Sequence, residues 1–211
     1  MVGVATLRSG VIGLRPIRTR DANEWRACRL RNREWLGPWD ATSPAGSADA
    51  PPTFAAMVRM LRAEARAGRT LPWVITEHDR LVGQLTMGGI ALGSLRSAHA
   101  GYWVDQEFAG RGIAPTALAM GIDHCFRSLG LHRVEINIRP ENGPSRRVVE
   151  KLGFRYEGLR ERYLHINGQW CDHLSFAVTS EEVPKGVLYR YLHGSADGIE
   201  PRLGMGPGNA V

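Results

Sequence analysis

Two periods of apolar residues along the chain mark its secondary structure. Residues 134–139 alternate between apolar and polar side chains, which predicts a half-buried strand. Residues 114–129 instead repeat apolar side chains at helical spacing, and Gly130 follows as a C-terminal cap. The apolar positions of this helix are Leu118, Ile122, Cys125, Phe126 and Leu129. A strand and a helix are therefore expected in succession near the middle of the chain.

The same patterns, read from end to end, predict the fold class. Strands are expected at residues 11–17, 71–78, 81–88, 99–105 and 134–139, followed by two strands joined at Asn167-Gly168 and ending near residue 178. Helices are expected at residues 21–35, 53–67 and 114–129, with a short one between Pro144 and Gly153. This order predicts an α/β protein with a mixed sheet and helices on its faces, not an alternating doubly wound fold.

The two ends of the chain are expected to differ from this pattern. Residues 1–9 are predicted to be flexible. Residues 1–180 are predicted to form one domain, and residues 181–211 a largely flexible C-terminal extension. Within that extension, residues 187–192 can form one or two helical turns, whereas the Gly/Pro-rich residues 194–211 are expected to be disordered.

Composition limits the class of protein. The 211 residues suit one globular domain. No apolar run approaches the roughly 18 residues of a membrane span, and the first residues lack a signal-peptide pattern. The three cysteines, Cys28, Cys125 and Cys171, lie far apart and form no metal-ligand spacing, so free thiols in a reducing cytoplasm are expected, with no metal.

The net charge of +6 is carried almost entirely by arginine, since Lys151 and Lys185 are the two lysines. Arginine suits bidentate contacts with phosphate, and a basic balance favours a phosphorylated cofactor, RNA or an acidic peptide as partner. A solvated basic surface with no partner is the alternative. We expect no DNA and no membrane partner, and the sequence leaves monomer and homodimer open.

The segment with the clearest chemistry covers residues 101–116. An aromatic strand ends near Asp105, a glycine-rich turn follows, and a helix begins near Ala114. Free N–H groups and the helix dipole make such a helix start a site for anions, so we predict that the turn holds a pyrophosphate. The residues concerned are Arg111, Gly112, Ile113, Ala114, Pro115 and Thr116. A tight connection without a ligand is the alternative; the spacing excludes a P-loop and a dinucleotide fingerprint.

Two motifs resemble those of the GNAT acyltransferase family. Ala109-Gly110-Arg111-Gly112-Ile113-Ala114 resembles the cofactor motif Q/R-x-x-G-x-G/A, with Ala109 where Gln or Arg is usual. Residues 142–158 resemble the signature N-x-x-S, E-K-L-G-F, E-G. With Leu14-Arg15-Pro16 and residues 32–36, the chain is similar to the Rim-type ribosomal-protein N-acetyltransferases, and above all to their RimJ-like members, over residues 12–178.

The resemblance implies the GNAT fold, a central, mostly antiparallel twisted sheet flanked by helices, and direct transfer of acetyl from acetyl-CoA to an amine. It implies that backbone N–H groups of Trp103 and Val104, at a strand bulge, polarise the thioester carbonyl. It implies Ser145 as the acid for the leaving thiolate, Asn142 as a ligand of the pantetheine arm and Arg147 as a phosphate contact. A serine bonded to its own helix, a helix cap and a solvated arginine are the respective alternatives.

The acceptor side and the general base stay more open. Trp35, Trp39 and Tyr102 are expected to line the acceptor channel, although core packing is the commoner role of Trp. An α-amine with a pKa near 8 needs only a modest base, whereas a lysine, with a pKa near 10.4, needs more help. The candidate bases, acting through water, are Glu77, Asp105, Glu107 and Glu161.

These features predict an acetyl-CoA-dependent N-acetyltransferase that acts on the α-amino group of a protein N-terminus. A small-subunit ribosomal protein is a candidate acceptor, which would entail ribosome association. Two alternatives stand beside it: a small-molecule amine N-acetyltransferase, for example one that modifies an amine antibiotic, and a ribosome- or RNA-associated CoA-binding module with little activity.

Overall fold

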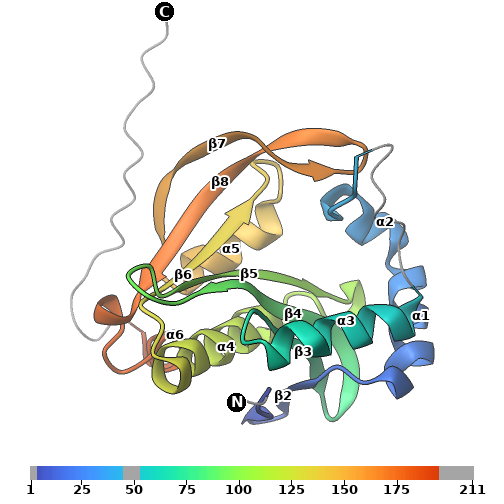
Figure 1. Ribbon diagram of the computed structural model, residues 1–211, viewed down its shortest axis with the longest axis horizontal. Coiled ribbons are helices and arrows are strands. Elements are labelled where there is room, and N and C mark those ends of the chain that lie inside the picture. Colours follow the sequence, from blue (N-terminus) through green and yellow to red (C-terminus); the bar gives the residue numbers. More distant parts are fainter. Residues whose placement is uncertain (1–3, 45–52, 195–211) are drawn as a thin grey trace, which may run out of the picture.

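The computed structural model describes residues 4–44 and 53–194, and within them eight strands form one sheet (Figure 1). The strands are β1 (Leu7–Ser9), β2 (Ile12–Pro16), β3 (Leu71–Glu77), β4 (Arg80–Ala91), β5 (Ser97–Val104), β6 (Arg133–Ile138), β7 (Arg155–Ile166) and β8 (Gln169–Thr179). The helices are α1 (Ala22–Arg31), α2 (Arg33–Leu36), α3 (Phe54–Arg66), α4 (Ile113–Leu129), α5 (Gly143–Lys151) and α6 (Val187–His193), with short 3-10 turns between some elements.

The strand order in the sheet is β1-β2-β3-β4-β5-β6-β8-β7. Every neighbouring pair is antiparallel except β5 and β6, which are parallel because α4 connects them. The prediction of a mixed, mostly antiparallel α/β sheet flanked by helices is confirmed. The hairpin at Asn167-Gly168 is confirmed as well, since it joins β7 to β8.

The N-terminal segment departs from prediction at two places. Within residues 1–9, expected to be flexible, Leu7–Ser9 pair with β2 through a turn at Gly10, whose φ is +56°. Asp21, near the expected helix start, makes no side-chain cap bond to α1. Its buried carboxylate instead accepts hydrogen bonds from the guanidinium of Arg15 (2.9 and 3.0 Å) and from the Arg18 N–H. Pairing and hydrogen bonds among residues 7–21 therefore decide both features.

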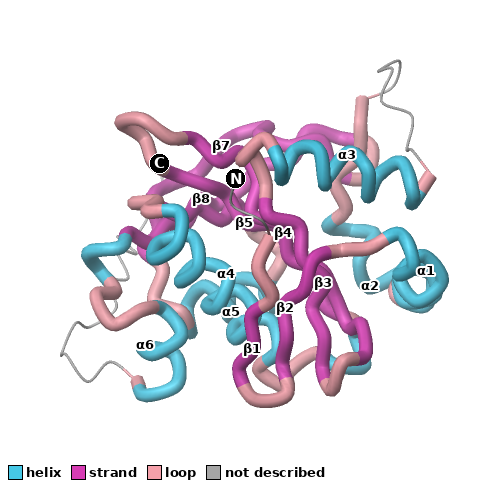
Figure 2. The backbone as a smooth tube through the Cα atoms, turned by 60° about the horizontal axis from the view of Figure 1, so that its bottom comes forward, coloured by secondary structure: helices cyan, strands magenta, loops and turns pink. Residues whose placement is uncertain are grey.

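Helices α4 and α6 lie on one side of strands β1 to β4, and α1 lies on the other (Figure 2). Strand alternation divides the core between these two faces of the sheet. Trp73 and Ile75 of β3 belong to the larger cluster, which includes the inner face of α4. Val74, between them, belongs to a smaller cluster with residues of α1 and α3. As predicted, Leu118, Ile122 and Cys125 are buried. No helix in the described residues is long and apolar enough to span a membrane.

The pairing of β5 with β6 covers only three residue pairs, from Ser97↔Arg133 to His99↔Glu135. Beyond them β5 continues along β4 to Val104, whereas β6 continues along β8 to Leu174. In Figure 1 the strands β6, β7 and β8 accordingly rise away from β5. The far half of β5 thus has a neighbouring strand on one side alone, and its other edge is free for a ligand.

The boundary expected at residue 180 falls inside a packed region. Val183 and Val187 are buried in the main core, and α6 packs along α4. The carboxylate of Asp123 on α4 accepts the N–H groups of Val187 (2.6 Å) and Leu188 (3.2 Å) at the start of α6. Residues 181–194 are therefore part of the folded domain, and residues 195–211 lie outside the described residues.

We predict that Gly83→Ala destabilises the protein. Residue 83 lies in β4, beside a shift in its register with β3. A Cβ at this position would collide with the carbonyl oxygen of Trp103 and would lie 3.2 Å from the Cα of Val104. Backbone atoms cannot move aside as a side chain can, so we expect a loss of about 1–3 kcal/mol in the free energy of unfolding.

Urea denaturation measures the Gly83→Ala effect, with Gly101→Ala on the neighbouring strand as control. A Cβ at Gly101 would meet no atom within 4 Å, so this variant should unfold close to the wild-type midpoint. Equal midpoints for the two variants would show that the sheet accommodates a side chain at residue 83.

Candidate functional site

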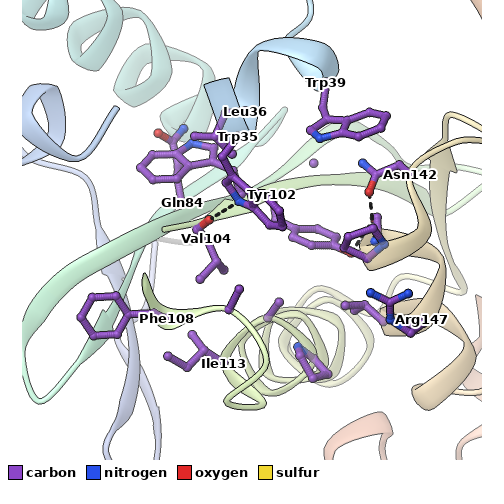
Figure 3. Close-up of a pocket in the computed structure, with 18 of the residues that line it drawn as sticks. Trp35, Leu36, Trp39, Gln84, Tyr102, Val104, Phe108, Ile113, Asn142 and Arg147 are labelled. Atoms are coloured by element: carbon purple, nitrogen blue, oxygen red, sulfur yellow. Dashed lines mark hydrogen bonds between the residues drawn. The ribbon is translucent and has the colours of Figure 1, made fainter. Parts of the chain in front are cut away.

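A cavity of about 530 Å³ lies where β5 diverges from β6 (Figure 3). Five parts of the chain line it: the segment from α2 to Asp40, two residues of β4, the far half of β5, the turn leading into α4, and α5 with the preceding Asn142. Of the predicted site residues, those that line the cavity are Trp35, Trp39, Tyr102, Trp103, Val104, Gly112, Ile113, Ala114, Pro115, Asn142, Ser145 and Arg147. Residues from sequence positions more than 100 apart thus meet in one space.

The turn into α4 has the geometry of an anion site. Gly112 is the N-cap of α4 and has a φ of +78°, a conformation that favours glycine. No hydrogen bond between described residues uses the N–H groups of Gly112, Ile113 or Ala114. Pro115, the next residue, has no N–H to satisfy. Three unused donors therefore lie at the positive end of a 17-residue helix that borders the cavity.

Arg111 and Thr116 lie outside the cavity lining. The guanidinium of Arg111 lies over the ring of Phe108, 4.9 Å from its centroid, and 3.7 Å from the carboxylate of Glu77. Thr116 is buried in the first turn of α4, where its N–H donates to the Gly112 carbonyl. Neither of these two side chains, nor Glu77, thus lines the cavity.

The free edge of β5 presents backbone groups to the cavity. The Asp105 N–H donates to the Val82 carbonyl of β4. Because backbone groups alternate in direction along an antiparallel strand, the N–H of Val104 faces away from β4, whereas that of Trp103 faces β4. The Val104 carbonyl accordingly accepts a bond from the indole N–H of Trp35 (3.3 Å). Of the two residues predicted for this role, Val104 therefore has the available donor.

The bulge implied at Trp103 and Val104 does not appear in the strand register. Pairing of β4 with β5 runs in step from Gly83↔Val104 to Gly88↔His99, and a shift occurs only beyond that, between Gly88 and Ala91. The backbone is nevertheless crowded there, because the carbonyl of Trp103 leans over Gly83. Strand divergence, rather than an inserted residue, exposes the edge of β5.

Two hydroxyl groups meet on one wall of the cavity. The oxygens of Tyr102, from β5, and Ser145, from α5, lie 2.8 Å apart (Figure 3). Burial raises the pKa of Tyr102 to about 12, although the bond to Ser145 opposes this, so Tyr102 is protonated at neutral pH. Asn142 caps α5 by accepting the Ser145 N–H (3.1 Å) and also lines the cavity, so its helix-cap role is established.

The part of the cavity lined by residues 35–40 is an aromatic wall that contains a carboxylate. Trp35 and Trp39 both line the cavity, and the guanidinium of Arg139 lies over the Trp39 ring at 5.7 Å. Asp40 lines the same wall and forms an ion pair with Arg29. Sequence reasoning missed Asp40, because an Asp before a loop of small residues looks like an ordinary turn residue.

The hairpin of β7 and β8 fixes this wall from outside. Ala41 pairs with Ile166, and the Thr42 N–H donates to the His165 carbonyl (2.9 Å). The N–H of Asn167 donates to the Asp40 carbonyl (3.3 Å). The tip of the last hairpin therefore positions the segment after α2, although the two are more than 120 residues apart in the sequence.

None of the four carboxylates predicted as general base lines the cavity. Asp105 is 0% exposed and is held by Arg31, by the amide of Asn32 (2.8 Å) and by the Glu107 N–H. Burial raises the pKa of Asp105, but these hydrogen bonds and the Arg31 charge outweigh it and leave the pKa below its ordinary value. Asp105 is thus an anchor of the fold.

The other candidate bases lie on the surface or are paired. Glu107 is exposed and lies 3.9 Å from Arg80, and Glu161 is exposed on β7. Glu77 faces Arg111.

All three cysteines are buried free thiols, as predicted. Burial, with the neighbouring charge of Asp105, raises the pKa of Cys28 to about 12, so Cys28 stays protonated beside that carboxylate.

Comparison with known proteins places this geometry in a family. The model of the acetyltransferase (GNAT) domain matches residues 12–155. The chain belongs to the GNAT acetyltransferase family. RimJ from Mycobacterium smegmatis, solved in complex with CoA-disulfide, is 48% identical with a TM-score of 0.82, over 90% of this chain and 92% of that one.

Curated relatives agree with this assignment. The [ribosomal protein uS5]-alanine N-acetyltransferase of Escherichia coli is 28% identical over 177 residues, which cover 82% of this chain and 90% of the relative. The probable N-acetyltransferase YjcK of Bacillus subtilis is 38% identical over 104 residues, 49% of this chain and 58% of that protein. The chain is an acetyltransferase of the Rim ribosomal-protein acetyltransferase type, with acetyl-CoA as co-substrate.

We predict that Asp105→Asn lowers stability by about 2–3 kcal/mol at pH 7, because Arg31 loses the charge that compensates it in a partly buried site. The folded-state pKa of Asp105 lies below its unfolded value of about 3.9. Its contribution is therefore full above that pH and is lost as the pH falls through the folded-state pKa.

Urea denaturation of both proteins between neutral and acid pH checks the Asp105 prediction. The difference in free energy of unfolding should shrink once the pH falls below about 4. A difference that stays constant down to acid pH would contradict the assignment of the charge. The folded variant should retain its turnover number, since Asp105 lies outside the cavity.

Proposed function

We propose that this enzyme transfers acetyl from acetyl-CoA to the α-amino group of a protein N-terminus. The observation that carries the proposal is the cavity at the free edge of β5, which joins unused N–H donors, a hydroxyl pair and an aromatic wall. Relatives of the Rim type support it, one of them named for the alanine of ribosomal protein uS5. A ribosomal protein is accordingly our candidate acceptor, met in the cytoplasm at the ribosome.

The cofactor is assigned to the side of the cavity formed by α4 and α5. The N–H groups of Gly112, Ile113 and Ala114 would bind the pyrophosphate. Arg147 and Lys151, which line the same side, would contact phosphate groups at its rim. The amide group of Asn142 would bind the pantetheine arm while its oxygen caps α5. Bound acetyl-CoA supplies an acetyl thioester, whose carbonyl must be polarised and whose sulfur must leave.

The far half of β5 and the hydroxyl pair would carry the chemical step. The Val104 N–H would donate to the carbonyl oxygen of the thioester as negative charge develops there, a role worth about 3–4 kcal/mol for one oriented donor. The amine nitrogen forms a bond to the carbonyl carbon, and the carbon–sulfur bond breaks. Tyr102 would donate to the Ser145 oxygen across their 2.8 Å contact. As the Ser145 proton passes to the departing sulfur, the proton of Tyr102, which is protonated at neutral pH, would pass to the serine oxygen, and solvent would return a proton to Tyr102.

Asp40 would bind the incoming amine. It is a carboxylate that lines the cavity, whereas the four predicted bases do not. Its ion pair with Arg29 holds it in place on the aromatic wall. A carboxylate there attracts an α-ammonium group, and water beside it can take the proton that the amine loses. Trp35 and Trp39 would hold the following residues by apolar contact.

We predict that Ser145→Ala lowers kcat by about tenfold to a hundredfold, with little change in the affinity for CoA. The effect falls at the low end for an acid because a thiolate with a pKa near 8.5 is already a tolerable leaving group. Tyr102→Phe should cost less, since Ser145 keeps its own hydrogen. Release of free thiol at saturating acetyl-CoA measures kcat. A decrease in kcat of less than about threefold in Ser145→Ala would show that Ser145 has a structural role in α5 and is not the acid.

The acceptor is tested with one peptide that bears both a free α-amine and a lysine. At neutral pH about a tenth of α-amines but less than about a thousandth of lysine side chains are neutral, and the site offers no strong dedicated base. We therefore predict acetylation at an N-terminus with a small first residue, located by mass spectrometry. Acetylation mainly at lysine, or of a small amine antibiotic with the peptide untouched, would overturn the assignment.

The same assay tests Asp40 through Asp40→Asn. Loss of a charge-assisted contact with the ammonium group should raise KM for the peptide by about tenfold while the affinity for CoA is unchanged. Glu34→Gln is the matched control, because it removes a carboxylate from the exposed face of α2, outside the cavity lining. Equal KM values in the two variants would exclude Asp40 from acceptor binding.

A further inference from the structure

The C-terminal helix α6 is held against both helices that border the cofactor side of the cavity. Asp123 of α4 accepts two N–H groups from its first turn. The guanidinium of Arg190, on its next turn, donates to the carbonyls of Leu152 and Gly153 at the end of α5. These bonds fix α6 relative to α4 and α5, so its side chains have defined positions with respect to the turn at Gly112.

Tyr191 of α6 reaches that turn. Its ring packs partly buried against the main core. Its hydroxyl oxygen lies 3.2 Å from the place that a Cβ on Gly112 would occupy, and it is the nearest atom to that place. Within the described part of the chain the hydroxyl has no hydrogen-bond partner. A hydroxyl group with an unused donor therefore lies close to Gly112, whose N–H is the first of the three unused donors at the start of α4.

We propose that Tyr191 is a cofactor-binding residue, and that α6 completes the pyrophosphate site from outside the segment that carries the family motifs. This inference rests on the proposed placement of the cofactor at the start of α4. A phenol hydroxyl donates to a phosphate oxygen in the same way as a backbone N–H, and hydrogen bonds to charged groups are stronger than neutral ones. If Tyr191 only packed against the core, its ring would be sufficient, and the position of its hydroxyl oxygen would have no explanation.

The position also explains why residue 112 must lack a side chain. A Cβ at Gly112 would lie 3.2 Å from the Tyr191 oxygen, a contact closer than ordinary van der Waals distance. It would also force a non-glycine residue to a φ of +78°. Substitutions at Gly112 therefore combine backbone strain with loss of the site, and they test the site less cleanly than removal of a single hydroxyl group.

Tyr191→Phe is that test, because it keeps the ring and removes only the oxygen. We expect the dissociation constant for CoA, measured by calorimetry, to rise by about five- to tenfold. Dephospho-CoA, which retains the pyrophosphate but lacks the 3′-phosphate, should lose affinity by the same factor. Pantetheine, which has no phosphate, should bind wild type and variant alike.

Tyr189→Phe on the same helix is the matched control. Tyr189 is exposed and its ring stacks on His193, 4.3 Å away, so its loss of a hydroxyl should leave all three dissociation constants unchanged. Three results for Tyr191→Phe would each overturn the proposal. The first is an unchanged affinity for CoA, and the second is a loss of affinity for pantetheine as large as that for CoA. The third is a loss of affinity for CoA with none for dephospho-CoA. Wild-type protein that fails to bind CoA would instead overturn the cofactor placement, and one that binds CoA but acetylates no peptide would overturn the acceptor.

Discussion

The short pairing between β5 and β6 is the constraint on which the site depends. Three residue pairs join the two strands, and beyond His99 each follows a different neighbour. A strand edge deprived of its partner leaves backbone donors and acceptors without bonds. Here the N–H of Val104 faces the resulting space. Helix α4 begins on one side of this space, and α5 begins on the other. Because α4 and α5 flank β6 in the sequence, the divergence of β6 also sets their separation.

Charged groups in this protein act mainly as anchors, and the groups that face the cavity are mostly neutral. Asp105 joins the end of β5 to α1 and Asn32, and Asp123 joins α4 to α6. Burial raises the pKa of Asp123, opposed by the hydrogen bonds from Val187 and Leu188. The cavity itself presents backbone N–H groups and paired hydroxyls. Such donors bind a phosphorylated thioester without placing an unpaired charge beside the reacting carbonyl.

Local sequence determined the elements and their order. The alternation at residues 134–139 became β6, the helical spacing before Gly130 became α4, Thr53 capped α3, and Asn167-Gly168 joined β7 to β8. These signals are short-range, because propensity, caps and turn residues act within a few positions. The glycine turn into α4 and the cap at Asn142 could be predicted from the sequence for the same reason. Membership of the GNAT family followed from motifs whose residues are close in sequence.

Tertiary structure decided which side chains face the cavity and which hold the fold together. Asp105 follows β5 and looked like a base until Arg31 and Asn32, over 70 residues earlier, enclosed it. Asp40 and Tyr191 carried no sequence signal, because their positions arise from the β7–β8 hairpin and from the packing of α6 on α4. Strand and helix patterns specify which residues are buried on an element. The direction of a polar side chain depends on partners brought from distant parts of the chain, and a single sequence does not encode those partners in its local pattern.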